Sequence, residues 1–131
     1  MNKSICYTLA KLLKEKGFEY LQTEDNDYEL GRHSYFKHYK SGEIHPLSHY
    51  YFDTSPNSVQ WTNLNINAPT IADVIMWLYE KHDIWIVVFP TEENWTFDIF
   101  NKIECVKSES FINSPTEAYE AAIEYTLTKL I

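Results

Sequence analysis

The chain contains few of the residues that interrupt regular structure. Its 131 residues include only 3 Gly and 5 Pro, whereas 44% of the residues are hydrophobic. Because a chain of this composition can bury a core, a disordered or collagen-like protein is excluded. We expect one compact domain over residues 1–131 that buries roughly two-thirds of the surface of its unfolded chain.

Basic residues are also scarce. There are 11 Lys and Arg against 19 Asp and Glu, the formal net charge is -8, and Arg32 is the single arginine. Nucleic-acid-binding proteins usually gather Lys and Arg on one face, and Arg is the preferred reader of phosphate and guanine. The sequence therefore predicts no direct contact with nucleic acid, while its acidity favours solubility and basic protein partners.

Long hydrophobic runs and cysteine motifs are missing as well. The longest apolar run, Ile84–Pro90, is too short to span a bilayer, and the first residues lead into an amphipathic stretch rather than an apolar signal core. The two cysteines, Cys6 and Cys105, lack the spacing of a redox or metal motif. We expect a cytoplasmic protein with reduced thiols and no membrane contact.

One phrase occurs twice in the chain. Residues 66–72 read Ile-Asn-Ala-Pro-Thr-Ile-Ala, and residues 112–118 read Ile-Asn-Ser-Pro-Thr-Glu-Ala. A Pro at the first helical position loses no intrahelical hydrogen bond. The phrase therefore predicts helices from about Pro69 to His82 and from Pro115 to about Leu130, the second with a capping box of Ser114 and Glu117.

The remaining pattern indicates one more helix and several strands. We expect a helix from Ser4, as its cap, to Lys16, ended by Gly17 in the left-handed conformation. The expected strands are a hairpin within 33–46, 48–52, Val59–Ile66, Ile84–Phe89 and Trp95–Phe100, extended by 103–106. The predicted fold class is α+β: a mostly antiparallel sheet of four to six strands with three helices, in the order α-β-β-(β)-α-β-β-α.

Four of the five histidines occur close together in the sequence and are the metal candidates. They are His33, His38, His45 and His49. A zinc site needs three or four such ligands on one point, but Pro46 disfavours a helix through the last two. On a regular strand, the odd spacing of the first two places them on opposite faces. We expect scattered surface residues, no metal and no cofactor.

The sequence contains no catalytic signature. There is no Gly-rich phosphate loop, and G-x-S-x-G, H-E-x-x-H and C-x-x-C are absent. Cys6 falls on the same predicted helix face as Leu9 and Leu13, so we expect a small core residue rather than a nucleophile. No catalytic residue is predicted, and an enzyme is disfavoured.

Trp77 is the unusual residue of the second predicted helix. At 100° per residue it lies with Asp73 and Lys81 rather than with the apolar stripe, and Met76 flanks it. An exposed Trp beside a Met is typical of an interface. The interface candidates are therefore Trp77, Met76, Asp73 and Lys81, most simply in a homodimer. The alternative is that another part of the chain covers Trp77.

The last predicted helix carries an acidic face of Glu117, Glu120 and Glu124 opposite its apolar residues. Such a stripe is the ordinary solvated side of an amphipathic helix. It is also the surface that would suit a basic partner.

Several segments together resemble a known group of proteins. They are Ala68-Pro69-Thr70, the run from Trp77 to Ile84, Trp95 and the closing helix Ser114–Ile131. With them the chain resembles small uncharacterised α+β proteins encoded in phages and mobile elements of gut Bacteroidetes. The resemblance implies an architecture but no activity and no functional residues. Residues 32–57 depart most from that pattern.

The functional prediction is a non-enzymatic interaction protein of phage or mobile-element type that self-associates. One alternative is an acidic inhibitor of a basic host nucleic-acid-binding protein, and another is a His-dependent metal hydrolase. The sequence leaves open whether the His- and Tyr-rich segment 32–52 is a binding surface or only sheet packing.

Overall fold

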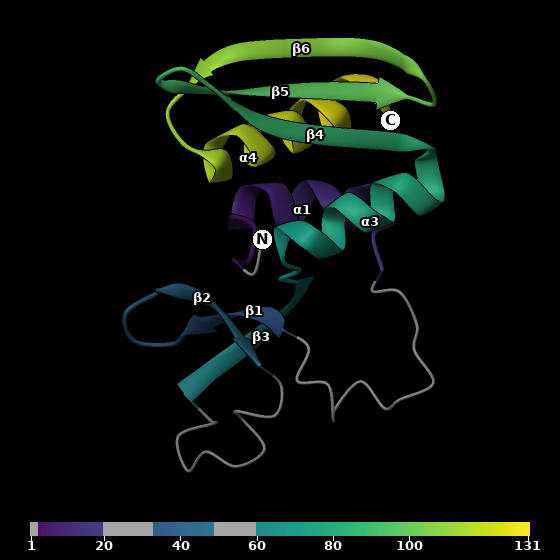
Figure 1. Ribbon diagram of the computed structural model, residues 1–131. Helices are drawn as coiled ribbons and strands as arrows, with labels where there is room; N and C mark the ends of the chain where they lie inside the picture. Colours follow the sequence, from purple (N-terminus) through teal and green to yellow (C-terminus); the bar gives the residue numbers. More distant parts are fainter. Residues whose placement is uncertain (1–2, 20–32, 49–59) are drawn as a thin grey trace. The chain divides into compact units, whose positions relative to one another are not determined.

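The computed structural model describes residues 3–19, 33–48 and 60–131, and within them the chain has an α+β fold (Figure 1). Its elements in chain order are α1 (Tyr7–Glu15), β1 (His33–His38), β2 (Ile44–Ser48), β3 (Trp61–Asn67), α3 (Ile71–His82), β4 (Ile84–Thr91), β5 (Asn94–Asn101), β6 (Glu104–Ile112), α4 (Pro115–Tyr125) and a π-helical turn η2 (Thr126–Leu130). The predicted α+β class with three helices is confirmed, whereas the predicted order is not matched, because β6 forms a separate strand between β5 and α4.

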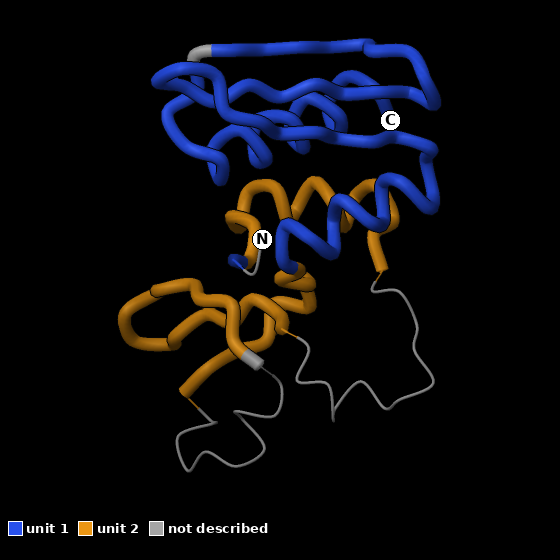
Figure 2. Tube along the Cα trace, viewed as in Figure 1, with its two compact units in different colours: residues 1–3, 70–131 blue, residues 4–69 orange. Residues whose placement is uncertain are grey.

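The chain divides into two compact units (Figure 2). Unit 2 comprises residues 4–69, and unit 1 comprises residues 1–3 and 70–131. Each unit contains a three-stranded antiparallel sheet, in the order β2-β1-β3 in unit 2 and β4-β5-β6 in unit 1. The expectation of one sheet with four to six strands is therefore wrong. In the sequence, α3 lies between β1–β3 and β4–β6. Each set of three strands pairs within itself, as strands that are close in the sequence usually do.

The first helix begins two residues later than expected. Cys6 is the N-cap of α1 and is exposed, so its prediction as a core residue is wrong. Ser4, the expected cap, instead donates a hydrogen bond to the carbonyl of Ala68 at 3.5 Å. The end is as predicted: Gly17 has a φ of +84°, and the Phe18 N–H bonds back to the carbonyl of Leu13.

The sheet of unit 2 confirms the predicted hairpin. β1 and β2 meet at a turn where Gly42, at a φ of +73°, donates to the carbonyl of His38. Tyr35 on β1 is buried, and its hydroxyl donates to the carbonyl of Ile5. Of the expected strand 48–52, only Ser48 is in β2, and 49–52 lie outside the described residues. β3 confirms the strand predicted around Trp61.

The repeated phrase starts its two helices differently. In the first copy Thr70 is the N-cap, and it forms a capping box with Asp73, so Pro69 precedes the helix instead of opening it. Ala68 has no side-chain acceptor, and the cap therefore moves to the next residue that has one. In the second copy Ser114 is the N-cap, accepts from the Glu117 N–H and leaves Pro115 at the start of α4, so the predicted cap is confirmed but only this half of the predicted capping box is formed.

Two tight turns connect the strands of unit 1. β4 continues through Pro90 to Thr91, which pairs with Asn94 across the turn at Glu92 and Glu93. Pro90 is tolerated because β4 is an edge strand. The second turn joins Asn101 to Glu104 and has Lys102 in the left-handed region at a φ of +59°.

Alternation along the strands gives the sheet of unit 1 two unlike faces. Buried apolar residues lie on one face and on the facing side of α4, namely Ile84, Ile86, Phe97, Ile99, Ala118, Ala122 and Ile123. This is the core of unit 1, and α4 runs along it (Figure 1). Trp85, Val87 and Phe100 point to the opposite face.

No helix in the described ranges is long and apolar enough to cross a membrane.

Candidate functional site

Trp77 is buried in the structure. It is 4% exposed, and its ring meets the ring of His82 edge-on at 4.8 Å between centroids. The interpretation of Trp77 as part of an exposed patch is therefore wrong. The buried side of α3 is wider than the apolar stripe predicted from the sequence. It includes Trp77 as well as the stripe residues Val74 and Leu78.

The other three interface candidates have different surroundings. Asp73 uses its carboxylate to cap the start of α3, where it accepts from the Thr70 N–H at 3.1 Å. Met76 is 40% exposed, and Lys81 is exposed. All three side chains are therefore exposed, but the Asp73 carboxylate is already engaged by the start of the helix.

The largest group of exposed apolar side chains in the described residues lies at one end of unit 1. Tyr79 is one helical turn beyond Met76 and is 52% exposed, and Trp85 on β4 is 40% exposed. The rings of Tyr79 and Trp85 meet edge-on at 5.2 Å between centroids. Trp85 pairs with half-buried Phe100 on β5. These contacts join the exposed side of α3 to the face of the sheet that lies opposite α4, which we call the helix-free face.

The turn between β5 and β6 extends this group. Ile103 at its tip is 97% exposed, and the neighbouring Lys102 N–H donates to the carbonyl of Asp83 at 3.1 Å. That bond holds the turn against the junction of α3 and β4, from which Trp85 follows. We call the surface formed by Met76, Tyr79, Trp85, Phe100 and Ile103 the end surface. Exposed apolar residues that gather in one part of a protein mark interaction sites more often than scattered ones do.

Farther along the same face, polar side chains bond to one another beside half-buried Val87 and Phe89. Thr96 donates to the Ser110 hydroxyl at 3.1 Å and lies 3.3 Å from the Thr91 hydroxyl. Ser108 donates to the Asp98 carboxylate at 2.6 Å. Trp85, at one end of the face, is therefore more exposed than the apolar side chains farther along it.

Charges of both signs surround the end surface. The acidic residues are Glu80, Asp83 and Glu104, the basic ones are Lys81 and Lys102, and all five are exposed. The net charge of these five residues is close to zero, although the formal net charge of the whole chain is -8. A partner that docks here meets no strong field of one sign.

The predicted acidic face on α4 is only partly available. Glu117 and Glu124 are exposed, whereas Glu120 is half-buried and its carboxylate lies 3.9 Å from the Lys3 ammonium. Two exposed carboxylates about two helical turns apart produce only a weak electrostatic field in water.

The histidines of unit 2 do not converge on a common point. His38 accepts at Nδ1 from the N–H groups of Lys40 and Ser41, both at 3.3 Å, so Nε2 carries the hydrogen and faces the Gln60 oxygen at 3.4 Å. His33 lies on the opposite face of β1, as the odd spacing predicts. His49 lies outside the described residues. The ranges that the structure describes hold no group of three metal-ligating side chains.

The rings of this segment pack on one another. Trp61 meets His38 at 4.9 Å and His45 at 5.9 Å between centroids, both edge-on. His38 also stacks on Tyr39, and His45 lies 3.3 Å from a carboxylate oxygen of Glu43. In the described part of segment 32–52 the aromatic residues therefore pack across the sheet.

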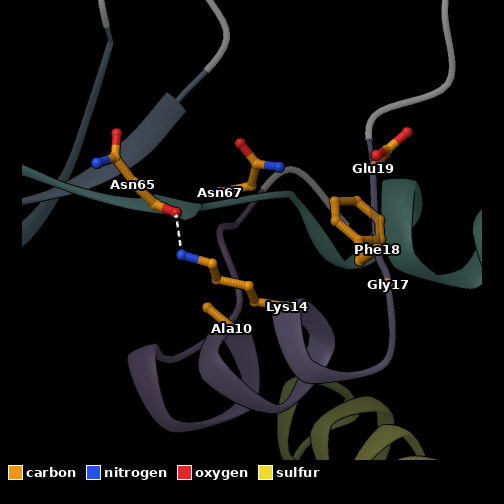
Figure 3. A pocket seen from close by; sticks show the side chains of 7 residues that line it. All are labelled: Ala10, Lys14, Gly17, Phe18, Glu19, Asn65 and Asn67. Carbon is orange, nitrogen blue, oxygen red and sulfur yellow. Dashed lines mark hydrogen bonds between the residues drawn. The ribbon is translucent and has the colours of Figure 1, made fainter.

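Unit 2 also has a small polar pocket between α1 and β3, with a volume of about 310 Å³ (Figure 3). The Lys14 ammonium donates to the carbonyl of Asn65 at 2.9 Å. Asn65 has a φ of +56° and sits at a bulge, where its N–H bonds to the Asn63 side chain at 2.8 Å. The remaining lining residues are Ala10, Gly17, Phe18, Glu19 and Asn67.

The polar contacts around the pocket explain the bulge. The Lys14 bond and the Asn63 bond hold the left-handed residue in place, a conformation that Asn tolerates better than most residues. The Lys14 cation of the pocket is already bonded to the backbone, and the other polar side chains of its lining are those of Glu19, Asn65 and Asn67.

Sequence reasoning identified Met76 and Lys81 but missed Tyr79, Trp85 and Ile103. The alternation of the strand pattern could have indicated Trp85, since its neighbours Ile84 and Ile86 occupy the core face. The position of Ile103 in a two-residue turn is a further signal, because turn tips are exposed. No family model matches the chain, and no curated protein or solved structure is significantly similar to it.

Proposed function

We propose that this chain is a non-enzymatic interaction protein that binds a protein partner through the end surface of unit 1. One observation carries the proposal: Met76, Tyr79, Trp85 and Ile103 are four of the five large hydrophobic residues exposed in the described ranges, and all lie around one helix–strand junction. Interfaces are enriched in Trp, Tyr and Met at their centre and depleted of net charge.

The surrounding chemistry supports binding over catalysis. A general acid or base needs a titratable group within reach of a substrate in a cleft. The end surface offers aromatic rings, a thioether and an aliphatic side chain, and its charges are exposed around the rim. Such side chains contribute affinity by leaving water and perform no proton transfer.

The acidic inhibitor is the second candidate, and the carboxylates of α4 are its support. Glu117 and Glu124 are exposed, but the engagement of Glu120 by Lys3 weakens the stripe. We therefore place the partner at the end surface. A His-dependent hydrolase has less support, because both ring nitrogens of His38 already face hydrogen-bond partners. We also propose a cytoplasmic location and a mobile-element origin, the latter on sequence resemblance alone.

The test is a capture experiment with the tagged full-length chain as bait, offered host lysate together with an untagged copy of the chain. Trp85→Ser with Tyr79→Ser should abolish capture of whatever the wild type retains. The matched control is Tyr39→Ser, which removes a tyrosine that is 61% exposed in unit 2.

Three outcomes contradict the proposal. Capture by the double variant at the wild-type level would exclude the end surface. Loss of capture in Glu117→Gln with Glu124→Gln would favour the acidic inhibitor. A wild type that retains neither its own copy nor any host protein would remove the interaction function altogether.

A further inference from the structure

The turn between β1 and β2 in unit 2 is held by a side chain as well as by its backbone. His38 ends β1 and accepts at Nδ1 from the N–H groups of Lys40 and Ser41, both at 3.3 Å. A ring nitrogen that accepts carries no hydrogen, so these bonds require the neutral imidazole with its hydrogen on Nε2. Asn, Asp and Ser usually bond to the backbone of a turn in this way. With a histidine instead, the turn depends on a type of side chain that changes charge between about pH 5 and 8.

Other contacts fix the orientation of the His38 ring. Nε2 faces the Gln60 oxygen at 3.4 Å. The ring stacks on Tyr39 at 5.7 Å, and Trp61 meets it edge-on at 4.9 Å between centroids. A rotation that carried Nδ1 away from the turn would break the contact with Gln60. Nδ1 therefore stays directed at the two N–H groups while these contacts last.

The charged groups beside the ring are engaged by other residues. The Glu43 carboxylate, in the turn, lies 3.3 Å from Nε2 of His45, the other titratable ring on this face of the sheet. The Lys40 ammonium lies 5.7 Å from the centroid of the Tyr39 ring. The contacts from β3 and the residue before it come from an indole and an amide, which carry no charge. A second proton on His38 therefore meets no carboxylate already placed to bind it in the described residues.

From these contacts we propose that the β1–β2 turn is a pH-sensitive switch, closed by neutral His38 and opened when its ring takes up a second proton. Protonation places a hydrogen on Nδ1, which then faces the N–H groups of Lys40 and Ser41 as donor against donor. Both bonds are lost, and water satisfies the freed groups because they are exposed. The Gly42 N–H still donates to the carbonyl of His38 at 2.9 Å. The turn therefore loosens as the pH falls, while β1 and β2 stay paired.

Nuclear magnetic resonance on the ¹⁵N-labelled full-length chain tests the switch between about pH 8 and 5. The ring nitrogen shifts should show the Nε2–H tautomer of His38 at the upper end. As the pH falls, the amide signals of Lys40 and Ser41 should move together with this ring. Their protection against hydrogen exchange should fall at least several-fold, whereas the amide of Tyr39, which donates to the carbonyl of Gln60, should keep its protection.

Three variants separate the switch from a general effect of pH. His38→Asn places an amide oxygen on Cγ, where the histidine has Nδ1, and should protect both amides at every pH because this side chain does not titrate. His38→Leu has no acceptor and should leave both amides unprotected throughout. His45→Gln removes the other titratable ring of this face and should behave as the wild type.

An Nδ1–H tautomer at the upper pH would overturn the inference, as would a wild type whose Lys40 and Ser41 protection does not change with pH. The inference also fails if His38→Asn loses protection at low pH as the wild type does, or if His45→Gln removes the pH dependence. All of these residues belong to unit 2, so each outcome is independent of the binding proposed for unit 1.

Discussion

Unit 2 and unit 1 each place a tryptophan near the start of an edge strand, Trp61 on β3 and Trp85 on β4. Trp61 has rings on two sides, since His38 and His45 both meet it edge-on. Trp85 has one ring contact, with Tyr79, and keeps 40% of its surface exposed. Similar positions in similar sheets therefore lead to different surfaces, and the neighbours on the adjacent strands decide which results.

The difference follows from what lies across the strand. In unit 2 the residue that pairs with Trp61 is His38, whose ring is held by hydrogen bonds to the turn that follows it. In unit 1 the residue that pairs with Trp85 is Phe100, which has no polar group to anchor it and is itself half-buried. A ring that is held by hydrogen bonds, such as that of His38, covers the tryptophan beside it. Beside Phe100, Trp85 keeps exposed apolar area that a partner can bury.

The largest effect is expected when Trp77 and Trp85 of unit 1 are exchanged for alanine one at a time. Trp77→Ala removes a buried ring and should lower the free energy of unfolding by about 3–5 kcal/mol. Trp85→Ala removes a side chain that is 40% exposed and should cost less, about 2 kcal/mol. Urea denaturation of both variants measures the contrast, and equal losses would contradict the assignment of Trp77 to the core.

A smaller effect is expected from the polar contact that ties Tyr35 to the N-terminal segment of unit 2. Tyr35→Phe keeps the ring but removes the buried hydroxyl that donates to the carbonyl of Ile5. Leaving that carbonyl without its donor should cost about 1–3 kcal/mol. The change is read from thermal unfolding, with Tyr39→Phe as the control, because the control hydroxyl belongs to a side chain that is mainly exposed. A Tyr35→Phe variant as stable as the control would disprove the contact.

The helix caps should give effects of about 1 kcal/mol. Thr70→Ala removes the side chain that accepts from the Asp73 N–H, and Ser114→Ala does the same at the start of α4. A denaturation series on the two variants measures these losses. If Thr70→Ala is as stable as the wild type, the assignment of Thr70 as the cap is wrong.

No change is expected on removal of metal ions. Because His38 is engaged at both nitrogens and His33 lies on the other face of β1, these two side chains cannot share a metal ion without rearrangement. A chelator should therefore leave the melting temperature unchanged. A drop on chelation that is reversed by one equivalent of zinc would refute this prediction.

The sequence was most informative where local chemistry determines the structure. The end of α1 at Gly17, the hairpin turn at Gly42 and the start of α4 after Ser114 each depend on one residue type with a specific backbone role. The alternation of β5 was equally clear, because Phe97 and Ile99 pack on one face. These features could be predicted because the residues that decide them are neighbours in the chain.

Features that depend on distant residues could not be predicted. The division into two sheets depends on which strands pair with each other. No local sequence pattern shows that β3 pairs with β1 rather than with β4. The burial of Trp77 depends on how wide an arc of α3 is covered, which a helical wheel does not contain. The end surface was missed for the same reason, because Tyr79, Trp85 and Ile103 come from three elements.

Hydroxyl-radical footprinting compares the two units most directly, since it reads the exposure of Met, Trp and Tyr side chains in one experiment. Between dilute and concentrated protein, or with and without a captured partner, the account predicts lower oxidation of Met76, Tyr79 and Trp85 in unit 1. Oxidation of Tyr39, an exposed tyrosine among the described residues of unit 2, should stay the same. Protection of Tyr39 with unchanged oxidation at Trp85 would contradict the assignment of the binding surface to unit 1.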